Sequence, residues 1–159
     1  MADYRTVRPA AGGTSIPGRQ GDERVVAATA DQQHRRYFFE LAVREFNSAI
    51  RYQRPLTLII FDLDGFKQAN DTFGHALGDS VLVEISKTAN IQVREVDILA
   101  RYGGDEFTIL LPETNVEQAF LIAERIRKAV EGTHIDMGGF STFITVSMGV
   151  AELSFDPQD

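Results

Sequence analysis

The chain has 159 residues, 43% of them hydrophobic and 25% charged, which is the composition of one ordinary globular domain with at most a short extension. Sixteen Lys and Arg against 23 Asp and Glu give a net charge of −7, which argues against a general nucleic-acid coat, because such binding needs a basic surface along the phosphates. The sequence has no cysteine, which excludes disulfide scaffolds, thiol catalysis and zinc sites built on cysteine.

The N-terminal part of the sequence shows neither a secretory signal nor a membrane segment. Its first 23 residues hold few large apolar side chains and several glycines and prolines, so we expect a flexible arm or linker over 1–23, ahead of one domain over 24–159. The most apolar run, 56–61, is far too short to cross a bilayer. These features predict a cytoplasmic protein without a membrane segment.

The first predicted elements are a helix and a buried strand. From about 25 to 53 apolar residues recur at helical spacing, and Pro55 ends the pattern. The short apolar run over 56–63 is typical of a buried strand. The helix is expected to bury the face that carries Phe39, Val43, Phe46 and Ile50.

The remaining elements alternate helices with strands. They are a short helix over 66–73, a second helix over 79–93, strands over 98–102 and 107–111, a helix over 117–131 and a strand over 142–153. Asp79 is expected to cap the second helix, and Thr114 to Glu117 has the form of a capping box. The two middle strands should form a hairpin, with glycine at a position of positive φ.

This order, a helix followed by β-α-α-β-β-α-β, predicts an α+β fold of the ferredoxin-like or palm type. A central antiparallel sheet would be flanked by helices, with one helix ahead of it. In such a sheet the first strand lies beside the hairpin in the middle of the sheet.

Two acidic groups would therefore meet at one end of the sheet. Asp62 and Asp64 end the first strand, and Asp105 and Glu106 follow the glycines of the hairpin. Clustered carboxylates are costly unless a positive charge lies between them, and a divalent cation with oxygen ligands would supply it. Each group taken alone also fits an ordinary strand end or hairpin turn.

Polar residues between these groups suit a nucleotide. The start of the short helix, with its free N–H groups and Lys67, is a natural seat for phosphate. Asn70 offers a donor and an acceptor and Asp79 accepts hydrogen bonds, as the edge of a guanine requires. The alternatives are a solvated lysine, a loop histidine at His75 and two helix caps.

Three segments together resemble the GGDEF family of diguanylate cyclases. Gly103 to Phe107 spells the GGDEF motif, and the segments FDLDGFK over 61–67 and NDTFGHALGD over 70–79 have the spacing of the family. The resemblance covers about 35–153. It implies that two GTP molecules, one on each of two facing domains, condense to cyclic di-GMP with loss of two pyrophosphates. It also implies an antiparallel homodimer and an upstream sensory or receiver domain outside this chain.

The resemblance also implies roles for single residues. Magnesium, with manganese as an alternative, would be bound by Asp62, the carbonyl of Leu63 and Asp105. Asp105 would accept the proton of the ribose 3′-hydroxyl, with Glu106 beside it. Lys67 would take part in catalysis by stabilising charge on the phosphates, helped by the backbone N–H groups of Gly65 and Phe66. The guanosine part of the substrate would be held by Asn70, His75 and Asp79.

A further motif is Arg94-Glu95-Val96-Asp97, which matches the RxxD product-inhibition site of the family. The planar donor fork of Arg94 suits a phosphate or the Hoogsteen edge of guanine. The resemblance therefore implies inhibitory binding of cyclic di-GMP at Arg94 and Asp97. Without the resemblance, an ion pair between residues three positions apart at a helix end is the first interpretation.

Two departures from the family pattern favour an alternative function. Of the D-x-LT-x-x-x-NRR segment, only Arg35 and Arg36 are kept, and the C-terminal helix of the family is not expected within this chain. The alternative is a weakened or inactive GGDEF domain that binds GTP or cyclic di-GMP. The sequence over 61–65 also looks like the nucleophile loop of haloacid-dehalogenase phosphatases, but the order of elements is wrong for their doubly wound fold.

Overall fold

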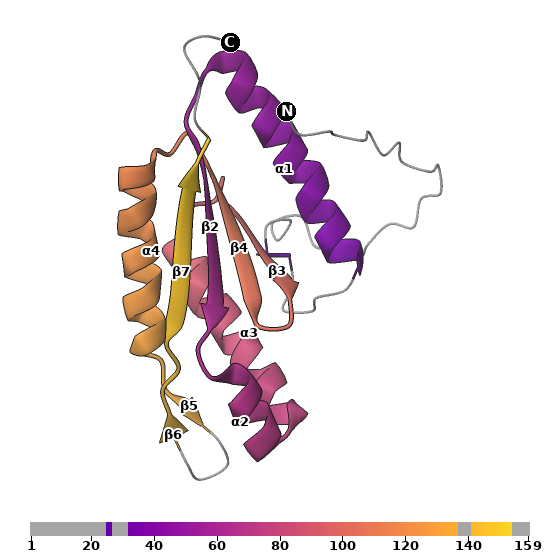
Figure 1. Ribbon diagram of the computed structural model, residues 1–159, viewed down its shortest axis with the longest axis vertical. Helices are drawn as coiled ribbons and strands as arrows, with labels where there is room; N and C mark the ends of the chain where they lie inside the picture. Colours follow the sequence, from indigo (N-terminus) through magenta and orange to yellow (C-terminus); the bar gives the residue numbers. More distant parts are fainter. Residues whose placement is uncertain (1–24, 27–31, 137–140, 154–159) are drawn as a thin grey trace.

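The computed structural model describes residues 25–26, 32–136 and 141–153 (Figure 1). In chain order its elements are β1 (Val25–Val26), α1 (Gln32–Tyr52), β2 (Leu56–Leu63), α2 (Phe66–Phe73), α3 (His75–Gln92), β3 (Ile98–Gly103), β4 (Glu106–Pro112), α4 (Val116–Glu131), β5 (Ile135–Asp136), β6 (Ser141–Thr142) and β7 (Val146–Glu152). The arm predicted over 1–23 lies outside the described residues.

The main sheet has the strand order β1-β3-β4-β2-β7. The pairs β3–β4, β4–β2 and β2–β7 are antiparallel, and β2 lies between β4 and β7. The predicted α+β fold with a central antiparallel sheet is therefore confirmed. Because β4 runs beside β2, the hairpin and the end of β2 reach the same end of the sheet, as Figure 1 shows.

The two faces of the sheet pack against different helices. One face, with α3 and α4, forms the larger core, and α1 packs on the other face in a smaller core around Phe38 and Leu110. In the larger core Phe61 stacks on its cross-strand partner Phe107, with ring centroids 5.0 Å apart. Burial of each such side chain contributes about 1.5–3 kcal/mol. This stack fixes the strand pair directly beneath the acidic residues that follow it.

The predicted face of α1 was wrong. Phe39, Val43 and Ile50 are each about half exposed, whereas Phe38 and Ala49 are 5% exposed. The helix carries apolar residues around more than half of its circumference. Its periodicity therefore could not indicate which part would lie on β3 and β4.

Several boundaries also differ from the prediction. Val25 and Val26 form a short strand parallel to β3 and not the start of a helix, because β3 offers a free edge to β-branched residues. Helix α3 begins at His75, so Asp79 lies inside the helix and does not cap it. Helix α4 is capped by Asn115, whose side chain accepts a hydrogen bond from the N–H of Gln118.

The last predicted strand is also divided. Only its first residue, Thr142, lies in β6, which pairs with β5, and the strand of the main sheet begins at Val146.

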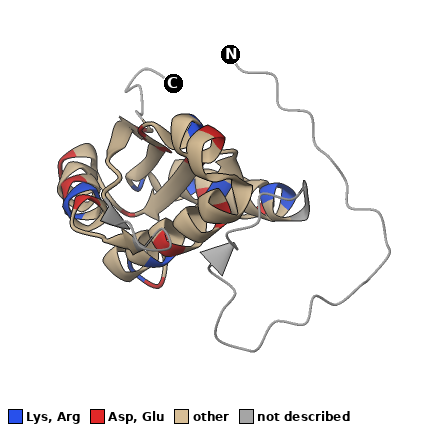
Figure 2. Cartoon of the chain, turned by 90° about the horizontal axis from the view of Figure 1, so that it is seen from below, with Lys and Arg blue, Asp and Glu red and all other residues tan. Residues whose placement is uncertain are grey.

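Within the described ranges, no helix combines the length and apolar character that crossing a bilayer requires. In the view of Figure 2, both basic and acidic residues lie on the helices.

Candidate active site

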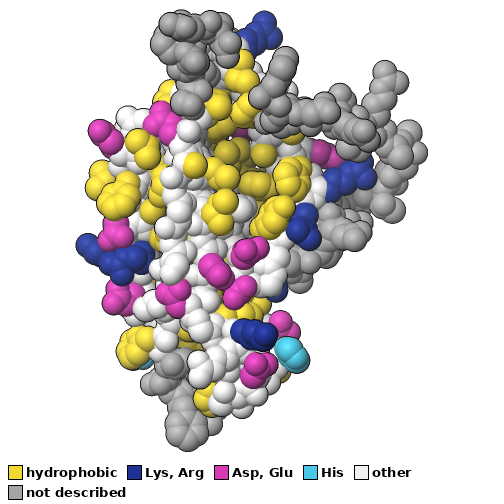
Figure 3. Space-filling model, in the orientation of Figure 1, with side chains coloured by type: hydrophobic (Ala, Val, Ile, Leu, Met, Phe, Trp, Pro, Cys, Tyr) yellow, Lys and Arg dark blue, Asp and Glu magenta, His cyan; other side chains and the backbone are white. Residues whose placement is uncertain are grey.

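Asp62 lies at the centre of the acidic end of the sheet. In the register of the sheet it is opposite Glu106 of β4 on one side and Ser147 of β7 on the other. Strand alternation turns Leu63 into the core, where it is 2% exposed, and leaves the carboxyl group of Asp62 exposed on the opposite face. Figure 3 shows acidic side chains gathered in the middle of this face, below a broad apolar area.

The hairpin turn brings Asp105 to Asp62. Gly104 has φ 42°, a conformation that favours glycine, and the β3–β4 pairing shifts register between Arg101 and Gly103. As a result, the carboxyl group of Asp105 lies close enough to that of Asp62 to raise its pKa. Residues far apart in the sequence thus meet at one point, as predicted.

The environment of Asp62 disfavours its charged form. Partial loss of solvent around the Asp62 carboxyl raises its pKa above the ordinary value, and the negative charges of Asp105 and Glu106 raise it further. The backbone N–H of Leu63 acts in the opposite direction. A cation between Asp62 and Asp105 would remove the repulsion that this arrangement contains.

Asp64 has a different environment from Asp62, although it is only two residues away. Its carboxylate accepts hydrogen bonds from the hydroxyls of Thr145 and Ser147, both at 2.7 Å, and its own N–H donates to the carbonyl of Thr145 at 2.9 Å. The two hydroxyls lower the pKa of Asp64. Asp64 therefore ties the loop after β2 to the start of β7.

This loop leads into the predicted phosphate seat. Gly65 is the N-cap of α2, and it supplies no side-chain cap for the free N–H groups of the first turn. Phe66 is buried and anchors the helix, whereas Lys67 is exposed. Free N–H groups and an exposed cation thus lie together beside the acidic end of the sheet.

The predicted base-binding residues lie at the corner of α2 and α3. Asn70 is in the last turn of α2, His75 is the first residue of α3, and Asp79 is in the second turn of α3. The side-chain oxygen of Asn70 is buried and has no hydrogen-bond partner within the described residues. His75 and Asp79 are exposed.

Arg101 lies near Asp79 and Asp105 and contacts the hairpin turn. It was not among the site residues predicted from the sequence. Its Nε donates to the carbonyl oxygen of Gly104 at 2.8 Å, which braces the hairpin turn. Burial lowers the pKa of Arg101, and the negative charges of Asp79 and Asp105 oppose this shift. The only signal in the sequence is its place directly before the Tyr-Gly-Gly turn.

The residues fit a divalent cation held by few protein ligands. In the part of the chain that the structure describes, no group of three or more His, Asp or Glu side chains is arranged to hold a metal ion. Two carboxylates, Asp62 and Asp105, are in contact, and magnesium commonly takes one or two protein carboxylates and completes its coordination with phosphate and water.

Arg94 and Asp97 form a turn and not the ion pair that the residue types alone suggest. The N–H of Arg94 donates to Oδ2 of Asp97 at 2.6 Å, and the N–H of Asp97 donates to the carbonyl of Arg94 at 3.1 Å. Asp97 is 2% exposed, and burial raises its pKa against the opposing effects of that N–H and of the charges of Arg94 and Arg125.

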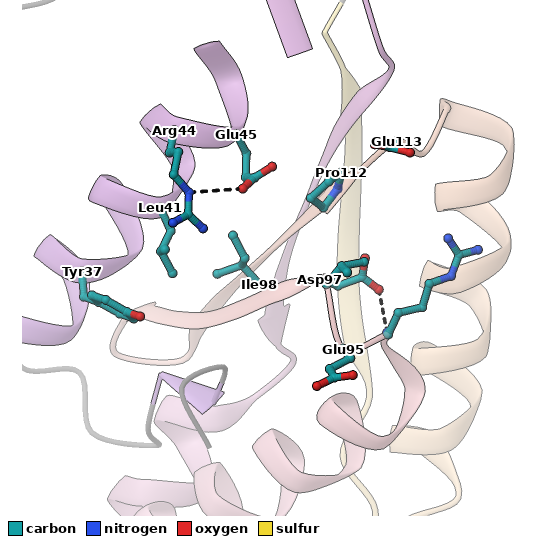
Figure 4. A pocket seen from close by; sticks show the side chains of 11 residues that line it. Tyr37, Leu41, Arg44, Glu45, Glu95, Asp97, Ile98, Pro112 and Glu113 are labelled. Carbon is teal, nitrogen blue, oxygen red and sulfur yellow. Dashed lines mark hydrogen bonds and ion pairs between the residues drawn. The ribbon is translucent and has the colours of Figure 1, made fainter. Parts of the chain in front are cut away.

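A cavity of about 540 Å³ lies beside this turn (Figure 4). Helix α1 lines it with Tyr37, Leu41 and Arg44, and the end of β4 lines it with Pro112. Arg44 forms an ion pair with the adjacent Glu45 at 3.5 Å. The turn therefore faces a space that includes both apolar and charged side chains.

Comparison with known proteins agrees with this geometry. The family described as "Diguanylate cyclase, GGDEF domain" matches residues 31–159. The chain is 42% identical to diguanylate cyclase A of Treponema denticola over 123 residues, which are 76% of this chain and 33% of that protein. It is 38% identical to diguanylate cyclase DosC of Escherichia coli over 125 residues, which are 78% of this chain and 27% of that protein.

Two solved structures show the same fold. The diguanylate cyclase SiaD of Pseudomonas aeruginosa, solved with its activator SiaC, has a TM-score of 0.73 and 38% identity over 76% of this chain and 46% of that one. The GGDEF domain of DgcB from Caulobacter crescentus, in complex with c-di-GMP, has a TM-score of 0.72 and 29% identity over 76% of this chain and 72% of that one. The chain spans a third or less of the length of the two curated relatives. Its fold, its motifs and these matches show that the chain belongs to the GGDEF-domain family of diguanylate cyclases.

Proposed function

We propose that this domain condenses two GTP molecules into cyclic di-GMP and two pyrophosphates. The observation that carries the proposal is the closeness of Asp62, in β2, to Asp105 of the hairpin turn, whose negative charge raises the pKa of Asp62. Such a pair is suited to a divalent cation and a triphosphate. Because GTP is a cytoplasmic nucleotide, the proposal also places the domain in the cytoplasm.

The proposed cation is Mg²⁺, with Mn²⁺ as an alternative, held by Asp62, Asp105 and the carbonyl of Leu63. When bound, it would neutralise the triphosphate and lower the pKa of a coordinated hydroxyl. The residues of the chain have distinct roles. Asp105 accepts the proton of the 3′-hydroxyl, and Glu106 adds negative charge beside it.

The 3′-oxygen of one nucleotide forms a bond to the α-phosphorus of the other, and the bond to the bridging oxygen breaks, so that pyrophosphate leaves. The backbone N–H groups at Gly65 and Phe66 and the ammonium of Lys67 hold the phosphates in line for this attack. Asn70, His75 and Asp79 hold the guanosine. Because each domain seats one nucleotide, the proposed active form is an antiparallel homodimer in which the reaction occurs twice.

The test is to incubate the purified chain with GTP and Mg²⁺ over a series of protein concentrations and to detect cyclic di-GMP by mass spectrometry. We expect a rate that rises more steeply than protein concentration, because two domains must meet. Asp105→Asn should abolish the product, and Glu113→Gln, which changes an exposed acid paired with Arg54 at the other end of β4, should not. Absence of both product and GTP binding in the unaltered chain would contradict the proposal.

A second candidate function is a binding module for GTP or cyclic di-GMP without turnover. The cavity beside the Arg94–Asp97 turn favours it, because a ligand there could be bound independently of catalysis. In either case we propose that Arg94 and Asp97 bind cyclic di-GMP, as an inhibitor or as a signal. Calorimetric titration with cyclic di-GMP tests this site: Arg94→Ala should weaken binding, and unchanged affinity would rule the site out.

A further inference from the structure

The corner between α2 and α3 is closer than a side chain at position 78 would allow. Gly78 is buried in the first turn of α3. A Cβ atom built on it would lie 1.8 Å from Oδ1 and 2.7 Å from Cγ of Asn70. Both separations are far below any contact between real atoms. The amide of Asn70 therefore occupies the space that a Cβ atom would fill in any other residue.

This amide is held by shape and not by hydrogen bonds. Its oxygen is buried and has no hydrogen-bond partner within the described residues. A single residue, Gly74, joins the two helices with φ 90° and ψ 163°, and its N–H donates to the backbone carbonyl of Asn70 at 2.8 Å. The corner thus fixes the backbone of Asn70, and the missing Cβ of Gly78 decides where the amide lies.

A side-chain amide held in one orientation can distinguish guanine from adenine, whereas an amide that rotates freely cannot. Guanine carries an acceptor, O6, where adenine carries a donor amino group. An amide that turns over exchanges its donor for its acceptor and can match either base. An amide held in one orientation presents one pattern, and the wrong base then leaves polar groups unpaired.

We propose that Gly78 is a specificity-determining position that holds the amide of Asn70 in the orientation selecting guanine over adenine. The inference rests on the proposed function, since it requires a guanine nucleotide at this corner. Gly78 directly precedes Asp79 in α3, so the close approach brings the amide of Asn70 to the part of α3 that also carries Asp79. Because Gly78 would act through the side chain of Asn70, it is a positioning residue.

The variant Gly78→Ala separates this role from a role in folding. The atoms that a new methyl group meets belong to the end of a flexible side chain, so the amide of Asn70 can rotate away. Alanine is also a better helix former than glycine. The variant should therefore be at least as stable as the unaltered chain, although it has lost its selectivity.

Calorimetric titration with Mg²⁺ and the α,β-methylene analogues of GTP and ATP tests the inference, because these analogues bind without being condensed. The ratio of the two affinities would be measured for the unaltered chain, Gly78→Ala, Asn70→Ala and the double variant. Gly132→Ala is the matched control, because a Cβ there would lie 3.4 Å or more from backbone oxygens of α4, an ordinary contact.

We expect Gly78→Ala to lower the guanosine preference at least about tenfold, mainly through weaker binding of the guanosine analogue. The double variant should match Asn70→Ala, since the methyl group then has no amide to displace. An unchanged ratio in Gly78→Ala, or a double variant below both single ones, would overturn this inference and leave the proposed function standing. An unaltered chain that prefers neither analogue would overturn both.

Discussion

The acidic end of the sheet and the Arg94–Asp97 turn both contain a carboxyl group with a raised pKa, and their neighbours differ in sign. At Asp62, burial is reinforced by the negative charges of Asp105 and Glu106. At Asp97, burial is opposed by a backbone N–H and by the charges of Arg94 and Arg125. In the turn, the protein's own N–H and arginine charges therefore offset the cost of burying the carboxylate of Asp97. For Asp62, only the backbone N–H of Leu63 among the described residues opposes the rise in pKa, so a bound cation is left to balance its charge.

The largest expected effect concerns the acidic end of the sheet. Asp62→Asn or Asp105→Asn should weaken Mg²⁺-dependent binding of the α,β-methylene GTP analogue by about 100-fold or more, because even residues that only support a metal ligand contribute 10–100-fold. Calorimetric titration measures the effect, with Glu113→Gln as the control. Equal affinities in the unaltered chain and both variants would show that these acids hold no cation.

The second prediction concerns the turn. Asp97→Ala should lower the free energy of unfolding by about 1–3 kcal/mol, because it removes the buried carboxylate that accepts a hydrogen bond from the N–H of Arg94. Arg94→Ala removes an exposed side chain and should change the free energy of unfolding by less than about 0.5 kcal/mol. Urea denaturation measures both. A stable Asp97→Ala variant would mean that the carboxylate does not hold the turn.

The third prediction uses the contrast within β2 and its following loop. Asp64→Asn should lower the melting temperature at pH 7 by about 2–4 °C, since two hydroxyl donors favour the charged carboxylate and its exposure limits the effect. Because its pKa is lowered on folding, this stability is present above the ordinary value of 3.8 and is lost as the pH falls through the folded value. The difference in melting temperature between the variant and the unaltered chain should therefore shrink as the pH falls below 3.8.

The smallest expected effect is a gain in stability and not a loss. In EDTA, Asp62→Asn should raise the melting temperature at pH 7 by about 1–2 °C, because the variant removes a repulsion that the folded state contains. A raised pKa means that stability falls as the pH rises from 3.8 through the folded value, so the gain should disappear at low pH. A variant that is less stable at pH 7 would show that the acids do not repel each other.

Much of the fold could be predicted because local patterns report local structure. The strand β2 and the helix α2 have the predicted bounds, since a run of apolar residues between Pro55 and Gly65 and a stop at Gly74 depend on the neighbouring residues alone. The meeting of Asp62 and Asp105 was also predicted, because the order of strands places the hairpin beside β2.

The incorrect predictions concern residues whose surroundings are set by segments distant in sequence. The buried side of α1 depends on how the helix crosses β3 and β4, and the strand at Val25 depends on the free edge of β3. The role of Arg101 depends on a carbonyl across a turn and on an acid in α3. None of these neighbours leaves a periodic signal in the sequence around the residue concerned.

By itself, then, the sequence determined the order of the elements, the glycine-rich turn and the clustering of acids at one end of the sheet, because each follows from spacing and side-chain chemistry. Only the tertiary structure decided that Asp62 lies against another acid whereas Asp64 lies against two hydroxyls of the segment leading into β7. The two residues have the same chemistry and nearly the same position. Segments distant in sequence pack beside them and give their carboxylates different neighbours. The carboxylate of Asp64 is stabilised by hydroxyl donors, whereas that of Asp62 lies beside another negative charge.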